Sequence, residues 1–116
     1  MTGRLQDKVC IITGTGSGMG RAAALAFSRE GARVVGAELN AASGRATDDM
    51  VRAAGGSITT LAPCDLSTPS GVEQLMALAV DTYGGVDVLY NNAAMAYFAW
   101  LPDMSYELWS RTLREE

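Results

Sequence analysis

The stretch VCIITGTGSGMGRAAALAF, from Val9 to Phe27, places four glycines between a short apolar run and an alanine-rich run. Glycine loses more backbone entropy on folding than any other residue, so a cluster of glycines indicates that another group must approach the backbone closely. The first run is rich in β-branched residues and predicts a buried strand, whereas the second predicts a helix. The glycines would then form a strand-to-helix loop, where backbone N–H groups and the start of a helix can bind an anion.

Strand and helix patterns alternate over the rest of the chain. Short apolar runs predict strands at residues 8–13, 33–38, 57–63 and 86–90. Helical composition and spacing predict helices at residues 18–29, 41–54, 69–83 and 103–116. The apolar sides of the last three helices are expected to include Met50, Val51, Ala54, Val72, Leu75, Met76, Ala79, Val80, Leu108, Trp109 and Leu113. This order predicts one α/β domain over residues 1–116, a Rossmann-like doubly wound parallel sheet of strand order 3-2-1-4.

The composition limits the partners and the location of the protein. The chain has 116 residues, of which 48% are hydrophobic, enough for the core of a single domain. Its formal net charge of −4 argues against nucleic acid or an anionic membrane surface as a partner. No apolar run approaches the roughly 20 residues that span a bilayer, and the start MTGRLQDKV lacks the apolar centre of a signal peptide. We therefore expect a cytoplasmic protein.

The chain contains no histidine and two cysteines, Cys10 and Cys64. A closed zinc site takes four Cys or His ligands, so we expect no metal site, and histidine-based nucleophilic catalysis is excluded within this chain. Both cysteines are expected to be buried as small apolar residues. In the predicted strand order the second strand separates them by about 9–10 Å, whereas a disulfide needs Cα atoms within about 7 Å, so we expect no disulfide.

Three known patterns fit the glycine loop poorly. GxxxxGK[ST] fails because no lysine follows any of the glycines. GxGxxA can be placed at Gly18, Gly20 and Ala23, but its first glycine should follow the strand directly, and the strand ends at Thr13. A site for a methionine-derived methyl donor usually carries an acid at the end of the first strand, where this chain has threonine.

The pattern that fits in register with the strand end is TGxxxGxG, at Thr13, Gly14, Gly18 and Gly20. Further landmarks follow in order: Glu38 at the end of the second strand, Asp65 in CDL after the third, and NNAA at residues 91–94 after the fourth. With these features the chain resembles the short-chain dehydrogenase/reductase family over nearly its whole length. Its departure from the motif NNAG is alanine in place of the glycine.

The resemblance implies a site for NAD. The residues that it assigns to the cofactor lie in the loop, at the strand ends and after the fourth strand: Gly14, Thr15, Ser17, Gly18, Met19, Gly20, Glu38, Leu39, Asp65, Leu66, Asn92 and Ala93. Glu38 would accept hydrogen bonds from the adenosine ribose and Asp65 from the adenine amine. The alternatives are a solvated loop acid for Glu38 and a helix cap for Asp65, while Asn91 either lines the cofactor or ties the sheet end together.

The resemblance also implies hydride transfer between nicotinamide and an alcohol or carbonyl carbon. The family uses a tyrosine with a lysine four residues later, a serine and usually an asparagine. The only lysine here is Lys8, so there is no YxxxK motif, and the position seven residues after Trp109, where the family often has its asparagine, is Glu116. We therefore expect no catalytic residue in this chain, which resembles the cofactor-binding half of an NAD-dependent oxidoreductase. The resemblance implies a small-molecule alcohol or ketone substrate and a homo-oligomer at full length.

Other hypotheses stay open at this point. A non-catalytic module that binds NAD(H) fits the same landmarks, whereas Thr13 and NNAA disfavour a methyltransferase-like nucleoside binder. The stretch MAYFAWL at residues 95–101 predicts either one wall of a substrate pocket or ordinary core packing. NAD is favoured over NADP because a 2′-phosphate would meet the like charge of Glu38, and neither Leu39 nor Thr15 supplies a compensating positive charge.

Overall fold

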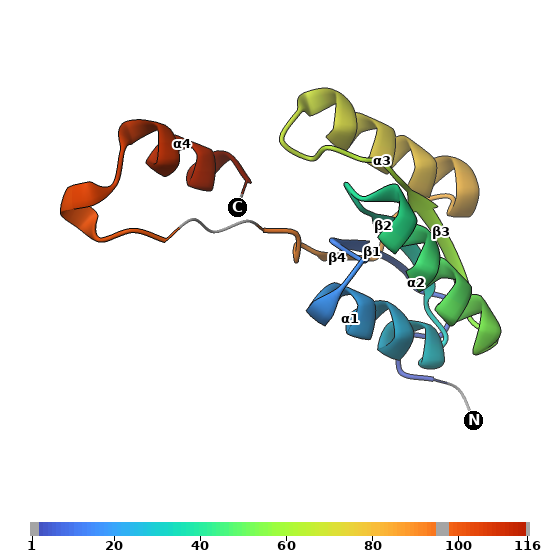
Figure 1. Ribbon diagram of the computed structural model, residues 1–116. Coiled ribbons are helices and arrows are strands. Elements are labelled where there is room, and N and C mark those ends of the chain that lie inside the picture. Colours follow the sequence, from blue (N-terminus) through green and yellow to red (C-terminus); the bar gives the residue numbers. More distant parts are fainter. Residues whose placement is uncertain (1–2, 95–97, 116) are drawn as a thin grey trace.

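The computed structural model describes residues 3–94 and 98–115; of the stretch 95–101, residues 95–97 therefore lie outside the described residues, as does Glu116. Within the described residues, one parallel sheet contains β1 (Val9–Thr13), β2 (Arg33–Ala37), β3 (Ser57–Leu61) and β4 (Val88–Tyr90). Its order is β3-β2-β1-β4, which confirms the predicted topology (Figure 1).

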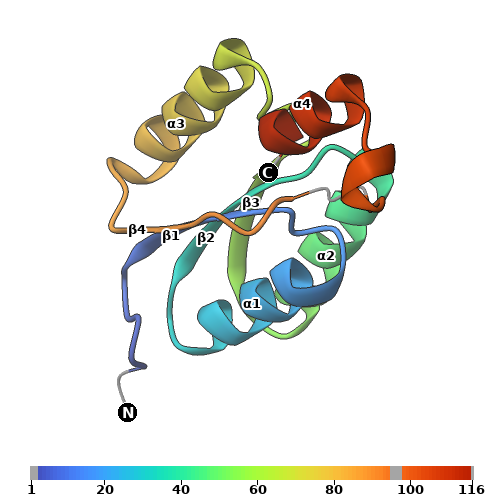
Figure 2. The ribbon, with the colours of Figure 1, turned by 90° about the vertical axis from the view of Figure 1, so that its left-hand side faces the viewer.

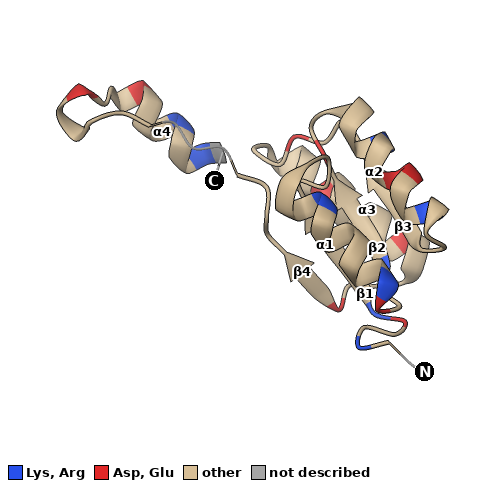
Figure 3. Ribbon diagram, turned by 60° about the horizontal axis from the view of Figure 1, so that its bottom comes forward, with Lys and Arg blue, Asp and Glu red and all other residues tan. Residues whose placement is uncertain are grey.

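Helices cover both faces of the sheet. The helices α1 (Gly18–Arg29) and α2 (Ala41–Ala53) lie on one face, and α3 (Pro69–Tyr83) lies on the other (Figures 1 and 2). The chain continues through a 3₁₀ turn, η1 (Leu101–Asp103), into α4 (Tyr106–Glu115), which lies apart from the sheet in Figures 1 and 3. The doubly wound arrangement places the carboxyl ends of all strands at one edge, where the glycine loop also lies.

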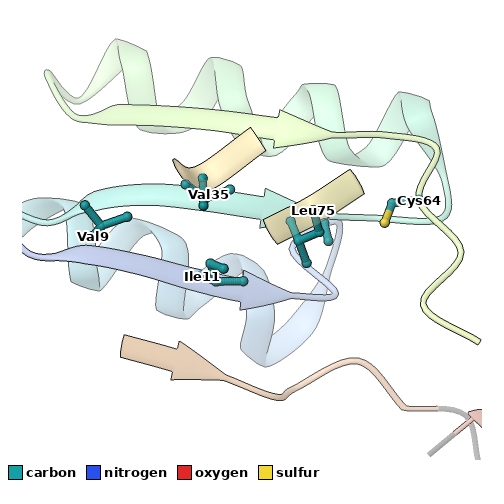
Figure 4. Close-up of a cluster of buried hydrophobic side chains, with 7 residues drawn as sticks. Val9, Ile11, Val35, Cys64 and Leu75 are labelled. Carbon is teal, nitrogen blue, oxygen red and sulfur yellow. The ribbon is translucent and has the colours of Figure 1, made fainter. Parts of the chain in front are cut away.

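The central strand β1 is buried on both sides, as a parallel sheet between two layers of helices requires. Val9 and Ile11 pack with Leu75 of α3, while Cys10 and Ile12 pack against α1 and α2. Figure 4 shows the first of these clusters, which also contains Val35 of β2 and Cys64.

Cys10 and Cys64 are both buried and free, so the expectation of no disulfide is confirmed. The two residues belong to core clusters on opposite faces of the sheet. The sheet itself therefore lies between the two cysteines, in addition to the strand that separates them along the sheet.

Local sequence signals explain several element ends. The hydroxyl of Thr68 accepts a hydrogen bond from the N–H of Gly71, and Pro69 occupies the first turn of α3, where its missing N–H does no harm. Gly84 ends α3 at φ +86°, a conformation that favours glycine. The third and fourth strands are shorter than predicted: β3 ends before Pro63, which cannot donate to a strand ladder, and β4 begins only at Val88.

Three predicted helix faces differ from the structure. In α3 Leu75 and Ala79 are buried, whereas Val72, Met76 and Val80 are exposed, because only the side of the helix that faces the sheet is covered. In α2 only Val51 of the three expected residues is buried, because its neighbours at helical spacing, Gly44 and Thr47, share its side, whereas Met50 is 43% exposed. The start of α4 lies at Tyr106, after η1, and Trp109 is 51% exposed. The apolar side of α4 is therefore not part of the core.

Charged residues surround the sheet. Figure 3 shows acidic and basic residues interspersed over the helices and turns, while the strands carry few of them. Among the described residues, no helix combines the length and the hydropathy needed to cross a lipid bilayer.

Candidate functional site

The first turn of α1 starts without a side-chain cap. Asn40 caps α2 and Thr68 caps α3, but the side chain of Ser17 makes no capping bond to α1, and no acidic residue lies in its first turn. Ser17, Gly18 and Met19 are exposed. The first N–H groups of α1 and the positive end of its dipole are therefore available to an anion at the carboxyl edge of the sheet.

The glycines of the loop have different roles. Gly14 and Gly18 have positive φ angles of +74° and +55°. A Cβ on Gly18 would point into open space, so this face of the loop can be approached, whereas a Cβ on Gly20 would collide with the carbonyl oxygen of Gly14. Gly20 therefore lets α1 start directly against the loop.

A buried hydroxyl joins the end of β1 to the segment after β4. Thr13 Oγ1 accepts hydrogen bonds from the backbone N–H groups of Asn92 and Ala93, both at 2.9 Å. The side-chain amide of Asn92 donates to the carbonyl oxygens of Thr13 and Gly14, at 3.1 and 3.4 Å. Asn92 therefore ties the sheet end together, whereas Asn91, for which the sequence left this role open, is exposed.

The carboxylate of Glu38 lies against the glycine loop. Its Oε1 accepts from the N–H of Gly16 at 2.7 Å, and its Oε2 accepts from the N–H of Asn40 at 2.9 Å. A Cβ on Gly16 would lie only 2.6 Å from Oε1 and 2.5 Å from Ser43 Oγ. Each carboxylate oxygen has two acceptor positions, so the half-buried group keeps capacity for further donors.

The segment after β3 forms a turn that leads into α3. Asp65 Oδ1 accepts from Ser67, from the hydroxyl at 2.6 Å and from the backbone N–H at 2.9 Å, and these bonds lower the pKa of the Asp65 carboxyl. The structure thus shows a turn-forming role for Asp65, close to the helix-cap alternative. Leu66 packs against the core on the α3 side, and Leu39 after β2 is exposed.

Three residues near the loop have roles that the motif did not indicate. Gly16 is the glycine that TGxxxGxG leaves unspecified, and its presence was the available signal for close packing at this position. Arg21 and Thr47 carried no signal in the sequence, yet both bind loop carbonyls.

Thr15, one of the residues that the resemblance assigned to the cofactor, is fully buried, and its Oγ1 has no hydrogen-bond partner.

The described residues contain no cluster of potential metal ligands. The fold and the loop together define the class of protein: an α/β protein of Rossmann type with a glycine loop at the carboxyl edge of its sheet. The model of the short chain dehydrogenase family matches residues 8–114. The chain therefore belongs to the short-chain dehydrogenase/reductase family.

Individual relatives agree with this assignment. The chain is 36% identical over 110 residues to an uncharacterized oxidoreductase of Thermotoga maritima, covering 95% of this chain and 43% of the relative. It is 40% identical over 113 residues to L-rhamnose 1-dehydrogenase (NAD(P)(+)) of Azotobacter vinelandii, covering 94% and 44%. A short chain dehydrogenase structure from Mycobacterium avium matches with a TM-score of 0.91 and 32% identity, covering 97% of this chain and 43% of that one. The chain thus spans less than half the length of these relatives.

Proposed function

We propose that this chain is the cofactor-binding part of an NAD-dependent oxidoreductase, which transfers hydride between nicotinamide and an alcohol or carbonyl substrate. The observation that carries the proposal is the combination of an uncapped α1 with the carboxylate of Glu38 beside the same loop. The family supports an oxidoreductase, and one relative is named for its use of NAD(P)(+). Both cofactor forms share the adenosine, pyrophosphate and nicotinamide groups that the site would bind.

The residues of this chain fit the parts of NAD. The free N–H groups at residues 18–20 would bind the pyrophosphate, since Gly18 leaves open space in front of them. Asp65 and Leu66 would border the adenine, and Asn92 and Ala93 would line the cofactor farther along the sheet edge. When bound, NAD supplies the carbon that accepts or donates the hydride.

Glu38 would select NAD over NADP. Its carboxylate is held in place by two backbone N–H groups and can still accept bonds from the ribose hydroxyls. Charge-assisted hydrogen bonds of this kind contribute about 1.5–3 kcal/mol. A 2′-phosphate would lose these bonds and meet a like charge, so we expect a preference of about ten- to a hundredfold for NAD.

Calorimetric titration with NAD and NADP tests this proposal. The unmutated protein should bind NAD more tightly, and Glu38→Ala should weaken NAD binding about tenfold or more, with a smaller effect on NADP. Glu73→Ala, which removes an exposed carboxylate from α3, is the control with the same change in charge. Tighter binding of NADP by the unmutated protein would contradict the role of Glu38, and binding of neither cofactor would contradict the proposal as a whole.

A second candidate function is that of a non-catalytic module that binds NAD(H). It rests on the same observation, because the uncapped α1 and the carboxylate of Glu38 serve cofactor binding by themselves. Both candidates predict cofactor binding by this chain, and neither predicts turnover by it alone. Alcohol-dependent reduction of NAD by the same sequence in its longest natural form would decide for the oxidoreductase, and cofactor binding without turnover over a panel of alcohols and ketones would favour the module.

A further inference from the structure

Arg21 follows the last glycine of the motif and reaches from α1 across to α2. Its Nη2 donates to the carbonyl oxygens of Gly16, at 2.6 Å, and of Ser43, at 3.3 Å. Its Nε donates to the hydroxyl of Thr47 at 2.8 Å. The guanidinium group therefore joins the glycine loop to the first two turns of α2, using donors in the fixed geometry that arginine provides.

Thr47 connects Arg21 to the peptide group between Thr15 and Gly16, because its hydroxyl accepts from the guanidinium and donates to that peptide group. The Thr47 hydroxyl is fully buried and donates to the carbonyl oxygen of Thr15 at 2.7 Å. The N–H at the other end of that same peptide group donates to Glu38 Oε1 at 2.7 Å. One chain of hydrogen bonds thus runs from the guanidinium, through the hydroxyl and the peptide group, to the carboxylate.

This chain of bonds fixes the direction of the peptide group. If the group turned over, its carbonyl oxygen would face the carboxylate of Glu38, and the bonds to Thr47 and to Glu38 would both be lost. Consecutive hydrogen bonds polarise one another, so a donor at Arg21 strengthens the N–H bond to Glu38. Within the described residues, Arg21 forms no ion pair, and its link to Glu38 runs through Thr47 and the loop.

We propose that Arg21 is a positioning residue for cofactor selectivity, which holds the Thr15–Gly16 peptide group so that Glu38 faces the ribose hydroxyls. This inference rests on the proposed function, because it assigns Arg21 an effect on the selectivity that Glu38 provides. Arg21 acts on the cofactor through the loop and through Glu38, and Thr47 is the intermediate that transmits the effect.

The test compares three variants by titration with NAD and with NADP, together with the midpoint of thermal unfolding. Arg21→Met removes all guanidinium donors, and Thr47→Val removes the intermediate hydroxyl at nearly constant volume. The control is Arg52→Met, because Arg52 also donates to a backbone carbonyl from α2, that of Ile58, at the far end of the helix. We expect Arg21→Met to weaken NAD binding about tenfold, Thr47→Val to weaken it less, and Arg52→Met to leave the ratio of the two dissociation constants unchanged.

A double-mutant cycle separates positioning from mere stabilisation. If Arg21 acts through Glu38, Arg21→Met should change NAD affinity in the unmutated background and leave it nearly unchanged in the Glu38→Ala background. Arg21→Lys should retain part of the selectivity, since the ammonium group can still donate hydrogen bonds but lacks the planar geometry of the guanidinium group. A fall in unfolding temperature with an unchanged NADP-to-NAD ratio in both Arg21→Met and Thr47→Val would overturn the inference. The proposed function would survive that result, because it fails only if the unmutated protein or Glu38→Ala departs from its own expected binding.

Discussion

The glycine loop is held on two sides by different kinds of group. On the β4 side, the contact consists of the buried hydroxyl of Thr13 with Asn92 and Ala93, all neutral groups. On the α2 side, two charged and partly exposed side chains, Arg21 and Glu38, each bind the backbone of the loop at Gly16. Neutral buried bonds fix the place of the loop, whereas the charged groups act on a ligand's charge and hydroxyls. We therefore expect changes on the β4 side to alter stability and changes on the α2 side to alter cofactor preference.

The largest effect is expected from Gly20→Ala, which would disturb the packing of the loop against Asn92 on the β4 side. The new Cβ would collide with the carbonyl oxygen of Gly14 and lie 2.8 Å from the side-chain amide of Asn92. Because backbone must move to make room, we expect a loss of about 3 kcal/mol in the free energy of unfolding, and loss of NAD binding. Urea denaturation measures the first effect. Gly85→Ala is the control, since a Cβ there meets nothing within 4 Å, and equal stability of the two variants would contradict the packing role of Gly20.

A smaller loss is expected from Thr13→Val, which keeps the shape of the side chain and removes its oxygen. The N–H groups of Asn92 and Ala93 would lose their common acceptor in a partly buried place. Unsatisfied groups of this kind cost about 1–3 kcal/mol, and we expect a loss of about 2 kcal/mol in the free energy of unfolding. Amide hydrogen exchange should show faster exchange at these two positions. Unchanged exchange there would show that the hydroxyl does not hold the segment after β4.

The smallest effect is expected from Thr15→Val, the same substitution two residues later. The hydroxyl of Thr15 is fully buried but has no partner, so its removal leaves no donor or acceptor unsatisfied. We expect the free energy of unfolding to stay within about 1 kcal/mol of the unmutated value or to rise. The difference in the free energy of unfolding between Thr13→Val and Thr15→Val, measured under the same conditions, gives the contribution of the hydrogen-bonded hydroxyl to stability. A loss as large as that of Thr13→Val would mean that the Thr15 hydroxyl has a partner in solution.

The sheet and its flanking helices could be predicted because their information is local and periodic. A buried run such as VCIIT identifies a central strand, and Thr68-Pro69 identifies the start of α3, with no knowledge of distant residues. The same local logic failed for Met50 and Trp109, because apolar character alone does not say which helix side finds a neighbour. The position of an apolar side chain depends on the tertiary contacts that its helix makes.

The site could be predicted as a set of residues but not as a set of bonds. The motif identified Glu38, yet its contact with Gly16 joins residues 22 positions apart and depends on the close approach of two loops. The chain of bonds through Arg21 and Thr47 likewise joins α1 to α2. Contacts between side chains and distant backbone groups depend on the folded geometry, which no spacing in the sequence encodes.

The thiols of Cys10 and Cys64 lie under opposite layers of helices. The rate at which each thiol reacts with a reagent can therefore report how often its own layer opens. Burial raises the pKa of both, with a smaller contribution from Asp87 for Cys10 and from Asp65 for Cys64. A buried, protonated thiol reacts with a disulfide reagent only when the chain above it opens. The rate of labelling at Cys10 therefore measures how fast the side with α1 and α2 opens. The rate at Cys64 measures how fast the side with α3 opens. A single labelling reaction, resolved by peptide mass, would show whether the two sides of the sheet come apart together or in turn.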